Sequence, residues 1–113
     1  NDVVALVVTT GEGDQETIIA SARYVVCASS EPRRSAEVAF TVEEDYHGQG
    51  IATHLLRHLV VIARQKGIVQ FDADVLQQNV AMLAVFAHCG LPMKKWKDTG
   101  SVHVTLDLTE AAA

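Results

Sequence analysis

The sequence predicts a mixed α/β (α+β) domain in which a strand–helix–strand unit lies inside a mostly antiparallel sheet. Two runs rich in β-branched residues flank a polar turn near the start of the chain and predict a hairpin. A further strand leads through a Gly-rich turn into a segment with helical apolar spacing, and another strand follows that helix. With 113 residues, the chain has the length of a single domain, residues 1–113.

The first half of the chain predicts three strands. Residues 3–10 are nearly all apolar and β-branched, which is typical of a strand that is buried on both faces. Residues 11–16 form a polar turn, and residues 17–27 complete an antiparallel hairpin. After a loop over residues 28–35, residues 36–42 form the third strand, in which Glu37 alternates with Val38.

The second half predicts two helices and three strands. Residues 51–66 repeat apolar side chains at helical spacing, and Gly67 is suited to end that helix. The crossover makes the next strand, residues 68–76, parallel to the third. Asn79 can cap a helix over residues 80–89 that is apolar almost all round, which predicts a helix enclosed in the core. Residues 94–98 predict a charged edge strand, and residues 102–108 alternate as the last strand.

Composition excludes several classes of protein. A net charge of -5 argues against nucleic-acid binding, which needs a basic surface. The sequence has no apolar run of membrane-spanning length and no signal-peptide pattern, so we expect a cytoplasmic protein without a membrane partner. Cys27 and Cys89 are then expected to be buried, reduced thiols. Because the chain starts at Asn1, we expect it to be a fragment of a longer one.

A phosphate-bearing ligand is predicted at the Gly-rich turn before the first helix, over residues 47–53. The first N–H groups of a helix lack partners within it, the helix dipole favours an anion there, and glycine allows close approach. A P-loop would need Lys-Ser or Lys-Thr where Ile51 and Ala52 stand. A dinucleotide-binding turn remains an alternative, although Thr53 occupies the position of its third small residue.

The turn His47-Gly48-Gln49-Gly50-Ile51-Ala52 resembles the Q/R-x-x-G-x-G/A signature of GNAT acetyltransferases, with His47 in place of Arg or Gln. The resemblance implies a GNAT-like sheet and acetyl-CoA as cosubstrate, with its pyrophosphate on this turn and no metal. It covers most of the chain but not the family's usual first strand and the two helices after it. The residues expected to contact the cofactor are Phe40, Thr41, Val42, His47, Gly48, Gln49, Gly50, Ile51, Ala52, Thr53, Asn79, Met82 and Phe86.

One branch of the family, the Pat-type protein lysine acetyltransferases, is more similar still. The similar stretches are residues 19–24, 36–42, 48–52, 55–56, 63–68 and 75–83. This resemblance implies a protein lysine as acceptor, for example one on a metabolic enzyme. Many GNAT members carry a Tyr that protonates the departing thiolate; Phe86 stands at that position here, and the absence of the Tyr also suits this branch.

Glu37 is the candidate general base. A lysine amine, with a pKa of about 10.4, is almost wholly charged at neutral pH, so a base must assist its attack on a thioester. Glu37 lies early on the strand that leads to the phosphate turn, in a stretch similar to the one that holds the catalytic Glu of protein lysine acetyltransferases. A solvated surface carboxylate is the competing interpretation, and Glu43 and Glu44 are weaker candidates because they lie nearer the phosphates.

Other functional patterns are weaker. His54 and His58 have a spacing that can bind metal, but no third ligand is evident, so a solvated helix face is favoured. His88 and Cys89 are neighbours on a helix and would point in different directions. Two further functions stay open: a non-catalytic acyl-CoA-sensing regulatory domain and a small-molecule amine acetyltransferase. Exposed sheet edges also suggest a homodimer.

Overall fold

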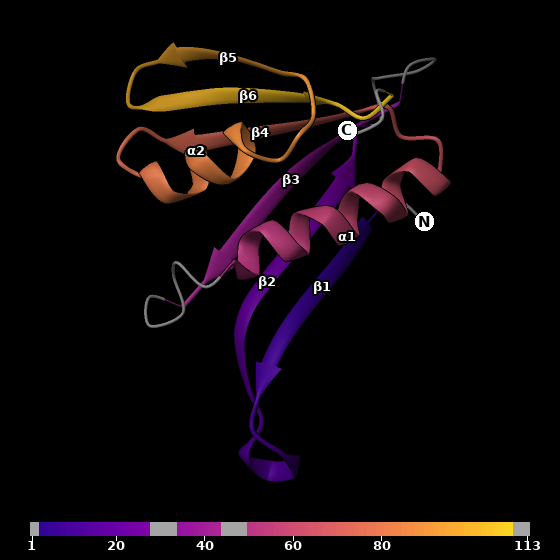
Figure 1. Cartoon of the computed structure of the whole chain (residues 1–113), viewed down its shortest axis with the longest axis vertical. Helices are drawn as coiled ribbons and strands as arrows, with labels where there is room; N and C mark the ends of the chain where they lie inside the picture. Colours follow the sequence, from indigo (N-terminus) through magenta and orange to yellow (C-terminus); the bar gives the residue numbers. More distant parts are fainter. Residues whose placement is uncertain (1–2, 28–33, 44–49, 110–113) are drawn as a thin grey trace.

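A six-stranded sheet with two helices on one of its faces forms the domain (Figure 1). The computed structural model describes residues 3–27, 34–43 and 50–109. The strand order is β1-β2-β3-β4-β6-β5. The elements, in chain order, are β1 Val3–Thr10, a 3-10 turn Gly13–Gln15, β2 Thr17–Val26, β3 Ser35–Val42, α1 Ile51–Gln65, β4 Gln70–Leu76, α2 Val80–Ala87, β5 Met93–Asp98 and β6 Ser101–Asp107.

The expected strand–helix–strand unit is confirmed. β3 and β4 are parallel and are joined through α1, whereas all other neighbouring strands are antiparallel. The core lies between the sheet and the helices, and its largest fully buried side chains include Tyr24, Phe71 and Phe86. The buried face of α1 consists of Leu55, Leu56, Leu59, Val60 and Ala63, as its spacing predicts. The opposite sheet face, which carries Glu37, Asp72 and His103, is called the open face below because neither helix packs on it.

The C-terminal end of α1 is capped as the sequence predicts. At the C-terminal end of α1, the Gly67 N–H donates to Arg64 O (3.1 Å) and the Ile68 N–H to Ala63 O (3.0 Å). These two bonds form a Schellman motif, which requires the positive φ of +80° at Gly67. Arg34 Nη1 also donates to Lys66 O at 2.7 Å. The C-terminal end of α1 is therefore firmly fixed, both to the residue that follows it and to the start of β3.

Two expectations about burial are wrong. β1 is an edge strand rather than a strand buried on both faces, and Val3 and Val7 are 47% and 56% exposed. Its apolar sequence suits the strand propensity of β-branched residues but does not determine its place in the sheet. Cys27 and Cys89 form no disulfide, but both are only half-buried rather than buried.

The second helix is also more exposed than its composition predicts. Of the residues in α2, only Phe86 is buried, and Val80 is 69% exposed. The helix stands above the space where β3 and β4 separate, so much of its apolar surface faces a cleft rather than packed side chains. In the described part of the chain, no helix has the length and apolar character needed to cross a membrane.

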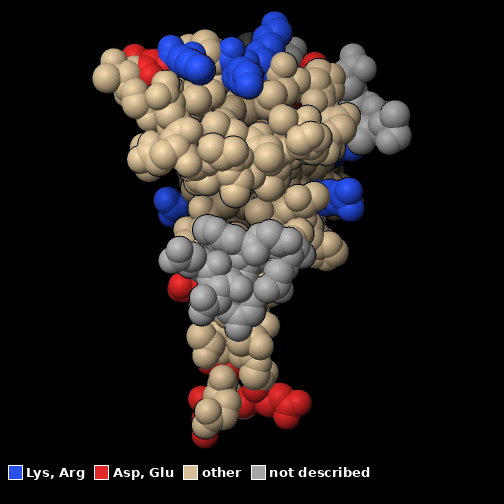
Figure 2. All heavy atoms as spheres, turned by 60° about the vertical axis from the view of Figure 1, so that its left-hand side comes forward, with Lys and Arg blue, Asp and Glu red and all other residues tan. Residues whose placement is uncertain are grey.

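Charge is unevenly distributed along the molecule. Figure 2 shows acidic residues at the tip of the β1–β2 hairpin, where Glu12, Asp14 and Glu16 are all exposed, and basic residues at the opposite end. There β5 forms the other sheet edge and exposes Lys94, Lys95 and Lys97. The long axis of the molecule is 44 Å, several times the Debye length of about 8 Å at physiological salt. The negative charges at the hairpin tip therefore have little effect on anion binding near the helices.

Tyr24 yields a prediction about stability. Its ring is fully buried against Phe71, yet its hydroxyl has no hydrogen-bond partner among the described residues. A Tyr24→Phe substitution keeps the ring packing and removes a desolvated polar group, so we expect the free energy of unfolding to stay the same or rise by about 1 kcal/mol. Urea unfolding at pH 7 measures this free energy. A decrease of more than about 1 kcal/mol in the variant would mean that the Tyr24 hydroxyl forms a hydrogen bond in the folded protein.

The same substitution should alter stability at alkaline pH. Burial raises the pKa of Tyr24 above its ordinary value of 10.0, and the nearby Arg34 guanidinium partly opposes this shift. The folded protein thus holds the phenolic proton more tightly than the unfolded chain. The resulting stabilisation is complete below pH 10 and is lost as the pH rises through the folded-state pKa. Raising the pH above 10 should therefore lower the free energy of unfolding of the native protein more than that of the Tyr24→Phe variant.

Candidate active site

β3 and β4 separate in the middle of the sheet, and this separation creates the site. Their parallel pairing covers only Ser35↔Gln70, Ala36↔Phe71 and Glu37↔Asp72. β3 nevertheless continues to Val42 and β4 to Leu76, so beyond Glu37 the facing backbone groups of the two strands do not pair with each other. Glu37 and Asp72 thus mark the point at which the sheet opens.

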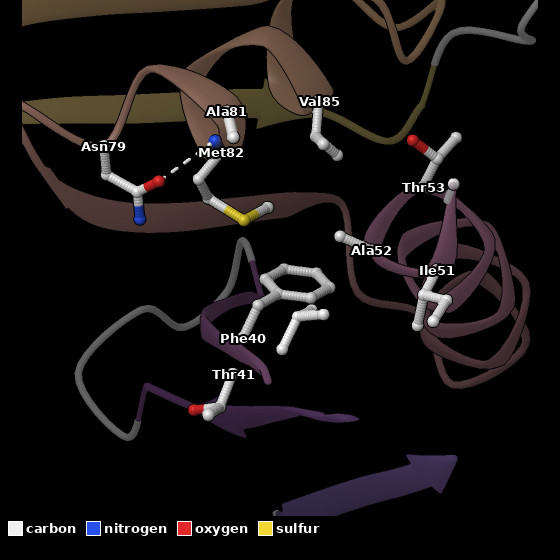
Figure 3. Close-up of a pocket in the computed structure, with 11 residues that line it drawn as sticks. Phe40, Thr41, Ile51, Ala52, Thr53, Asn79, Ala81, Met82 and Val85 are labelled. Atoms are coloured by element: carbon white, nitrogen blue, oxygen red, sulfur yellow. Dashed lines mark hydrogen bonds between the residues drawn. The ribbon is translucent and has the colours of Figure 1, made fainter. Parts of the chain in front are cut away.

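A cleft of about 540 Å³ begins beyond this point and lies between β3, the start of α1 and the start of α2 (Figure 3). In Figure 3, Phe40 and Met82 face each other across the cleft, with Ala52 on the side of α1. The full lining comprises Phe40, Thr41, Val42, Gly50, Ile51, Ala52, Thr53, Asn79, Ala81, Met82 and Val85. The middle of the cleft is mainly apolar and suits a flexible ligand with few charges.

The end of the cleft at α1 is suited to an anion. Gly50 is the N-cap of α1 with φ +77°, and no side chain caps the helix there. The first α-helical bond runs from His54 N–H to Gly50 O (3.0 Å), so the preceding N–H groups have no acceptor within the helix. The first turn of α1 contains no acidic residue. N–H groups without an acceptor inside α1, together with the positive end of the helix dipole, therefore lie at this end of the cleft.

The opposite wall is held by the cap of α2. Asn79 Oδ1 accepts a hydrogen bond from the Met82 N–H at 3.2 Å, as the sequence predicts for an N-cap (Figure 3). This bond fixes the first turn of α2 and with it the Met82 side chain. Phe86 is 1% exposed and lies behind Phe40, edge-to-face, with 5.9 Å between ring centres. Phe86 thus supports the cleft wall and is not part of the lining.

Nine of the residues predicted to contact the cofactor come together in this lining, from three separate segments of the chain. Another three predicted residues, His47, Gly48 and Gln49, lie outside the described residues, as does Glu44. Sequence reasoning missed Ala81 and Val85. Val85 lies three residues after Met82, so the helical spacing from Met82 was a signal that could have found it.

Glu37 lies on the open face and is exposed. It shares that face of β3 with Thr41, which lines the cleft four residues farther along the strand. Across the sheet, Asp72 Oδ1 accepts hydrogen bonds from Gln70 Nε2 (2.9 Å) and Thr105 Oγ1 (3.1 Å). Asp72 is thus held by its neighbours, whereas Glu37 has no hydrogen bond or ion pair within the described part of the chain.

The other candidate groups do not assemble into a catalytic centre. His54 and His58 contact each other on the exposed side of α1, with 3.2 Å between their Nε2 atoms. Among the described residues, no group of three or more His, Cys, Asp or Glu side chains could hold a metal ion. His103 bonds Asp74 and stacks on Trp96 on the open face, with ring centres 5.4 Å apart. The structure thus gives His103 a defined set of partners.

Comparison with known proteins gives the family. The chain matches the model of the acetyltransferase (GNAT) family over residues 4–91. It is 37% identical over 97 residues to acetyltransferase Pat of Mycolicibacterium smegmatis, covering 86% of this chain and 28% of that protein. The GNAT domain of Streptomyces lividans PAT superimposes with a TM-score of 0.79 at 35% identity, covering 94% of this chain and 61% of the other.

A more distant structure adds support for the fold. A Salmonella typhimurium protein solved with its cofactor acetyl-CoA matches with a TM-score of 0.70 and 22% identity, over 86% of this chain and 62% of that one. This chain thus spans less than a third of the curated relative and about three fifths of the solved GNAT domain. The family match covers most of the chain and agrees with its fold and with the cleft at the N-terminus of α1. The chain therefore belongs to the GNAT family of acetyltransferases.

Proposed function

We propose that this domain transfers an acetyl group from acetyl-CoA to the side-chain amine of a protein lysine, by direct attack with Glu37 as general base. One observation carries the proposal: Glu37 stands where β3 and β4 separate, three residues before Phe40, and from Phe40 onward the same strand lines an apolar cleft that ends at an uncapped helix N-terminus. The arrangement offers one place for a phosphate, one for a flexible arm and one for a proton acceptor, in that order.

The cleft supports acetyl-CoA as the donor. The pyrophosphate would accept hydrogen bonds from the first N–H groups of α1, over residues 50–53. The pantetheine arm would lie between Phe40 and Met82, and its amides could bond the backbone of β3 where that strand no longer pairs with β4. From Val42 to Glu37 the extended strand covers about 17 Å, at about 3.3 Å per residue, and the arm would bring the thioester along this path.

The transfer itself needs one base. The neutral amine attacks the thioester carbonyl carbon, and Glu37 accepts the amine proton directly or through a water molecule. The tetrahedral intermediate then collapses, the C–S bond breaks and CoA leaves as a thiolate. Thr41, Thr53 and Asn79 are the polar side chains of the lining, and Phe86 replaces the expected Tyr. We therefore infer that the thiolate takes its proton from water, since Glu37 holds the one proton that the amine releases.

A protein acceptor agrees with the position of the base. Glu37 is exposed on a broad open face rather than enclosed in a pocket, so a lysine on a large partner could reach it. The similarity to Pat proteins supports the same class of acceptor. A non-catalytic acyl-CoA sensor is the second candidate, and the apolar Phe86 at the position of the usual acid favours it. A small-molecule amine acetyltransferase is the third candidate. It differs from the protein lysine acetyltransferase in the acceptors that it modifies.

Calorimetric titration with acetyl-CoA, with NAD as control, tests the donor. We expect acetyl-CoA to bind with micromolar affinity and NAD not to bind. Turnover is then measured on lysine peptides and on free amines, by release of CoA. Turnover on peptides supports the lysine acetyltransferase, turnover on free amines alone supports the third candidate, and binding without turnover supports the sensor. If NAD binds in place of acetyl-CoA, the dinucleotide interpretation of the Gly-rich turn is correct.

A further inference from the structure

A tryptophan stands exposed on the open face of the sheet. Trp96 lies in the edge strand β5 and is 56% exposed. Its indole stacks on the His103 ring, with 5.4 Å between ring centres and 28° between the ring planes. Tryptophan is enriched at binding surfaces because its rigid ring offers a large contact area at a small cost in conformational entropy. The acetyl-transfer mechanism above uses neither of the two rings.

The ring beneath the tryptophan is held from two sides. His103 Nδ1 donates a hydrogen bond to Asp74 Oδ1, and His103 Nε2 lies 3.7 Å from Asp98 Oδ2. The Thr99 N–H donates to the other oxygen of Asp98 at 2.8 Å, which fixes that carboxylate. Because His103 is fixed in this way, Trp96 stacks on a ring of defined orientation. The four residues Asp74, Trp96, Asp98 and His103 are called the Trp96 platform below.

The Trp96 platform lies one step along the sheet from the candidate base. Glu37 is paired with Asp72, and Asp74 comes two residues later in β4, on the same face. His103 lies opposite Asp74, and Trp96 lies opposite His103. With about 4.8 Å between strands and about 3.3 Å per residue, the backbone of Glu37 is about 8 Å from that of Asp74 and about 16 Å from that of Trp96. An extended peptide with a lysine at Glu37 therefore crosses the platform about two to five residues from that lysine.

The open face around the platform is acidic. In strands β3 to β6, the described residues on this face carry one lysine or arginine, Lys94, and five carboxylates, those of Glu37, Asp72, Asp74, Asp98 and Asp107. Lys95 and Lys97 of β5 belong to the opposite face. The side chain of Asp74 is 63% exposed, and among the described residues its Oδ2 forms no hydrogen bond. This charge favours a cationic peptide over an acidic one.

We propose that the Trp96 platform binds an arginine of the acceptor protein, about two to five residues from the lysine that is acetylated. The guanidinium lies on the exposed surface of the Trp96 indole and pairs with the Asp74 carboxylate. This inference rests on the proposed function and narrows it to acceptors with an arginine near the lysine. Arginine suits the platform better than lysine, because its planar guanidinium stacks on an aromatic face and also donates hydrogen bonds to a carboxylate.

A set of acceptor peptides tests this specificity through turnover. Each peptide carries one lysine and one arginine among small uncharged residues, and the arginine is moved through every position up to five residues before and after the lysine. We expect kcat/KM to rise about 5- to 10-fold, through a lower KM, at the position where the arginine reaches the platform. Citrulline at that position, which keeps the shape but removes the charge, should abolish the gain.

Variants of the platform assign the gain to its residues. The readout is the ratio of kcat/KM between the arginine and the citrulline peptide, since a general loss of structure lowers both values equally. Trp96→Leu and Asp74→Asn should each bring this ratio close to one, and Trp96→Phe, with a weaker aromatic face, should keep part of it. Val7→Ala is the control for an exposed apolar side chain, because Val7 is also 56% exposed on the open face but lies in β1, at the other sheet edge. Asp14→Asn, at the hairpin tip, is the control for a carboxylate, and both controls should leave the ratio unchanged.

The fluorescence of Trp96 gives a second measurement, which does not depend on turnover. Trp96 is the only tryptophan in the sequence, so a change in tryptophan emission reports on the platform. The arginine peptide should quench or shift this emission in a saturable manner, and the citrulline peptide should need about 5- to 10-fold higher concentrations. In Asp74→Asn the two titration curves should coincide.

The outcomes separate this inference from the proposed function. If arginine gives no gain at any position, if citrulline gives the same gain, or if the gain persists in Trp96→Leu, the platform does not bind arginine, while lysine acetylation stands. If no peptide is acetylated but the arginine peptide still changes the Trp96 emission, the platform binds arginine and the proposed function fails. If the peptides neither turn over nor change the emission, both the proposed function and this inference are wrong.

Discussion

A Glu37→Gln substitution should lower the turnover number by about 10²- to 10⁴-fold, the usual contribution of a general base. Affinity for acetyl-CoA should change little, because the Glu37 side chain stands on the open face and is not part of the cleft lining. Glutamine keeps the size and polarity of the side chain but cannot accept the proton. Steady-state kinetics on a lysine peptide, together with calorimetry on acetyl-CoA, measures both effects.

The pH dependence of the variant makes the test sharper. Without the base, the reaction depends on the small fraction of lysine that is already neutral, and this fraction rises about tenfold per pH unit below the amine pKa of about 10.4. The rate of Glu37→Gln should therefore rise steeply between pH 7 and pH 9. A rate that stays low across this range would show that Glu37 does something other than remove the amine proton.

Glu43→Gln is the matched control for charge. Glu43 is an exposed carboxylate directly after the same strand, at the phosphate end of the cleft. Its neutralisation should leave turnover unchanged and should not weaken acetyl-CoA binding, because it removes a negative charge near the phosphates. Equal losses of turnover in both variants, or loss of acetyl-CoA binding in Glu37→Gln, would contradict the assignment of Glu37 as the base.

The parts of the fold that could be predicted from the sequence are those determined by neighbouring residues. The apolar spacing of α1 gives its buried face, because helical periodicity repeats within a few residues. Asn79 caps α2 through a bond to a residue three positions away, and Gly67 ends α1 because only glycine adopts its positive φ without strain. The parallel pairing of β3 and β4 follows from the length of the crossover between them.

The parts that could not be predicted depend on where β3 and β4 separate. No local pattern indicates that their pairing stops at Glu37, since the residues beyond it still alternate as in an ordinary strand. Once the strands separate, α2 covers an opening, and its apolar residues become cleft walls instead of core. Ala81 was missed for this reason, and Phe86 was expected in contact with the cofactor although it packs behind Phe40.

A Gly50→Ala substitution should reduce affinity for acetyl-CoA by about 10- to 100-fold, the equivalent of one lost charge-assisted hydrogen bond. Gly50 has φ +77°, and a Cβ built there meets no atom within 4 Å. The added methyl group would therefore project from the turn at the uncapped end of α1, where a phosphate must approach the backbone. The substitution also forces an L-residue into the left-handed region, at a cost to stability of about 1–2 kcal/mol.

Gly67→Ala separates these two effects. Gly67 has nearly the same φ, +80°, and a Cβ there also meets no atom within 4 Å, but it lies at the other end of α1. Both variants should lose the same stability, seen as similar drops in melting temperature, while only Gly50→Ala should lose acetyl-CoA affinity. Equal affinities in the two variants would mean that the Gly50 turn only starts a helix. A loss of affinity in both would mean that the orientation of α1, rather than access to its N-terminus, controls binding.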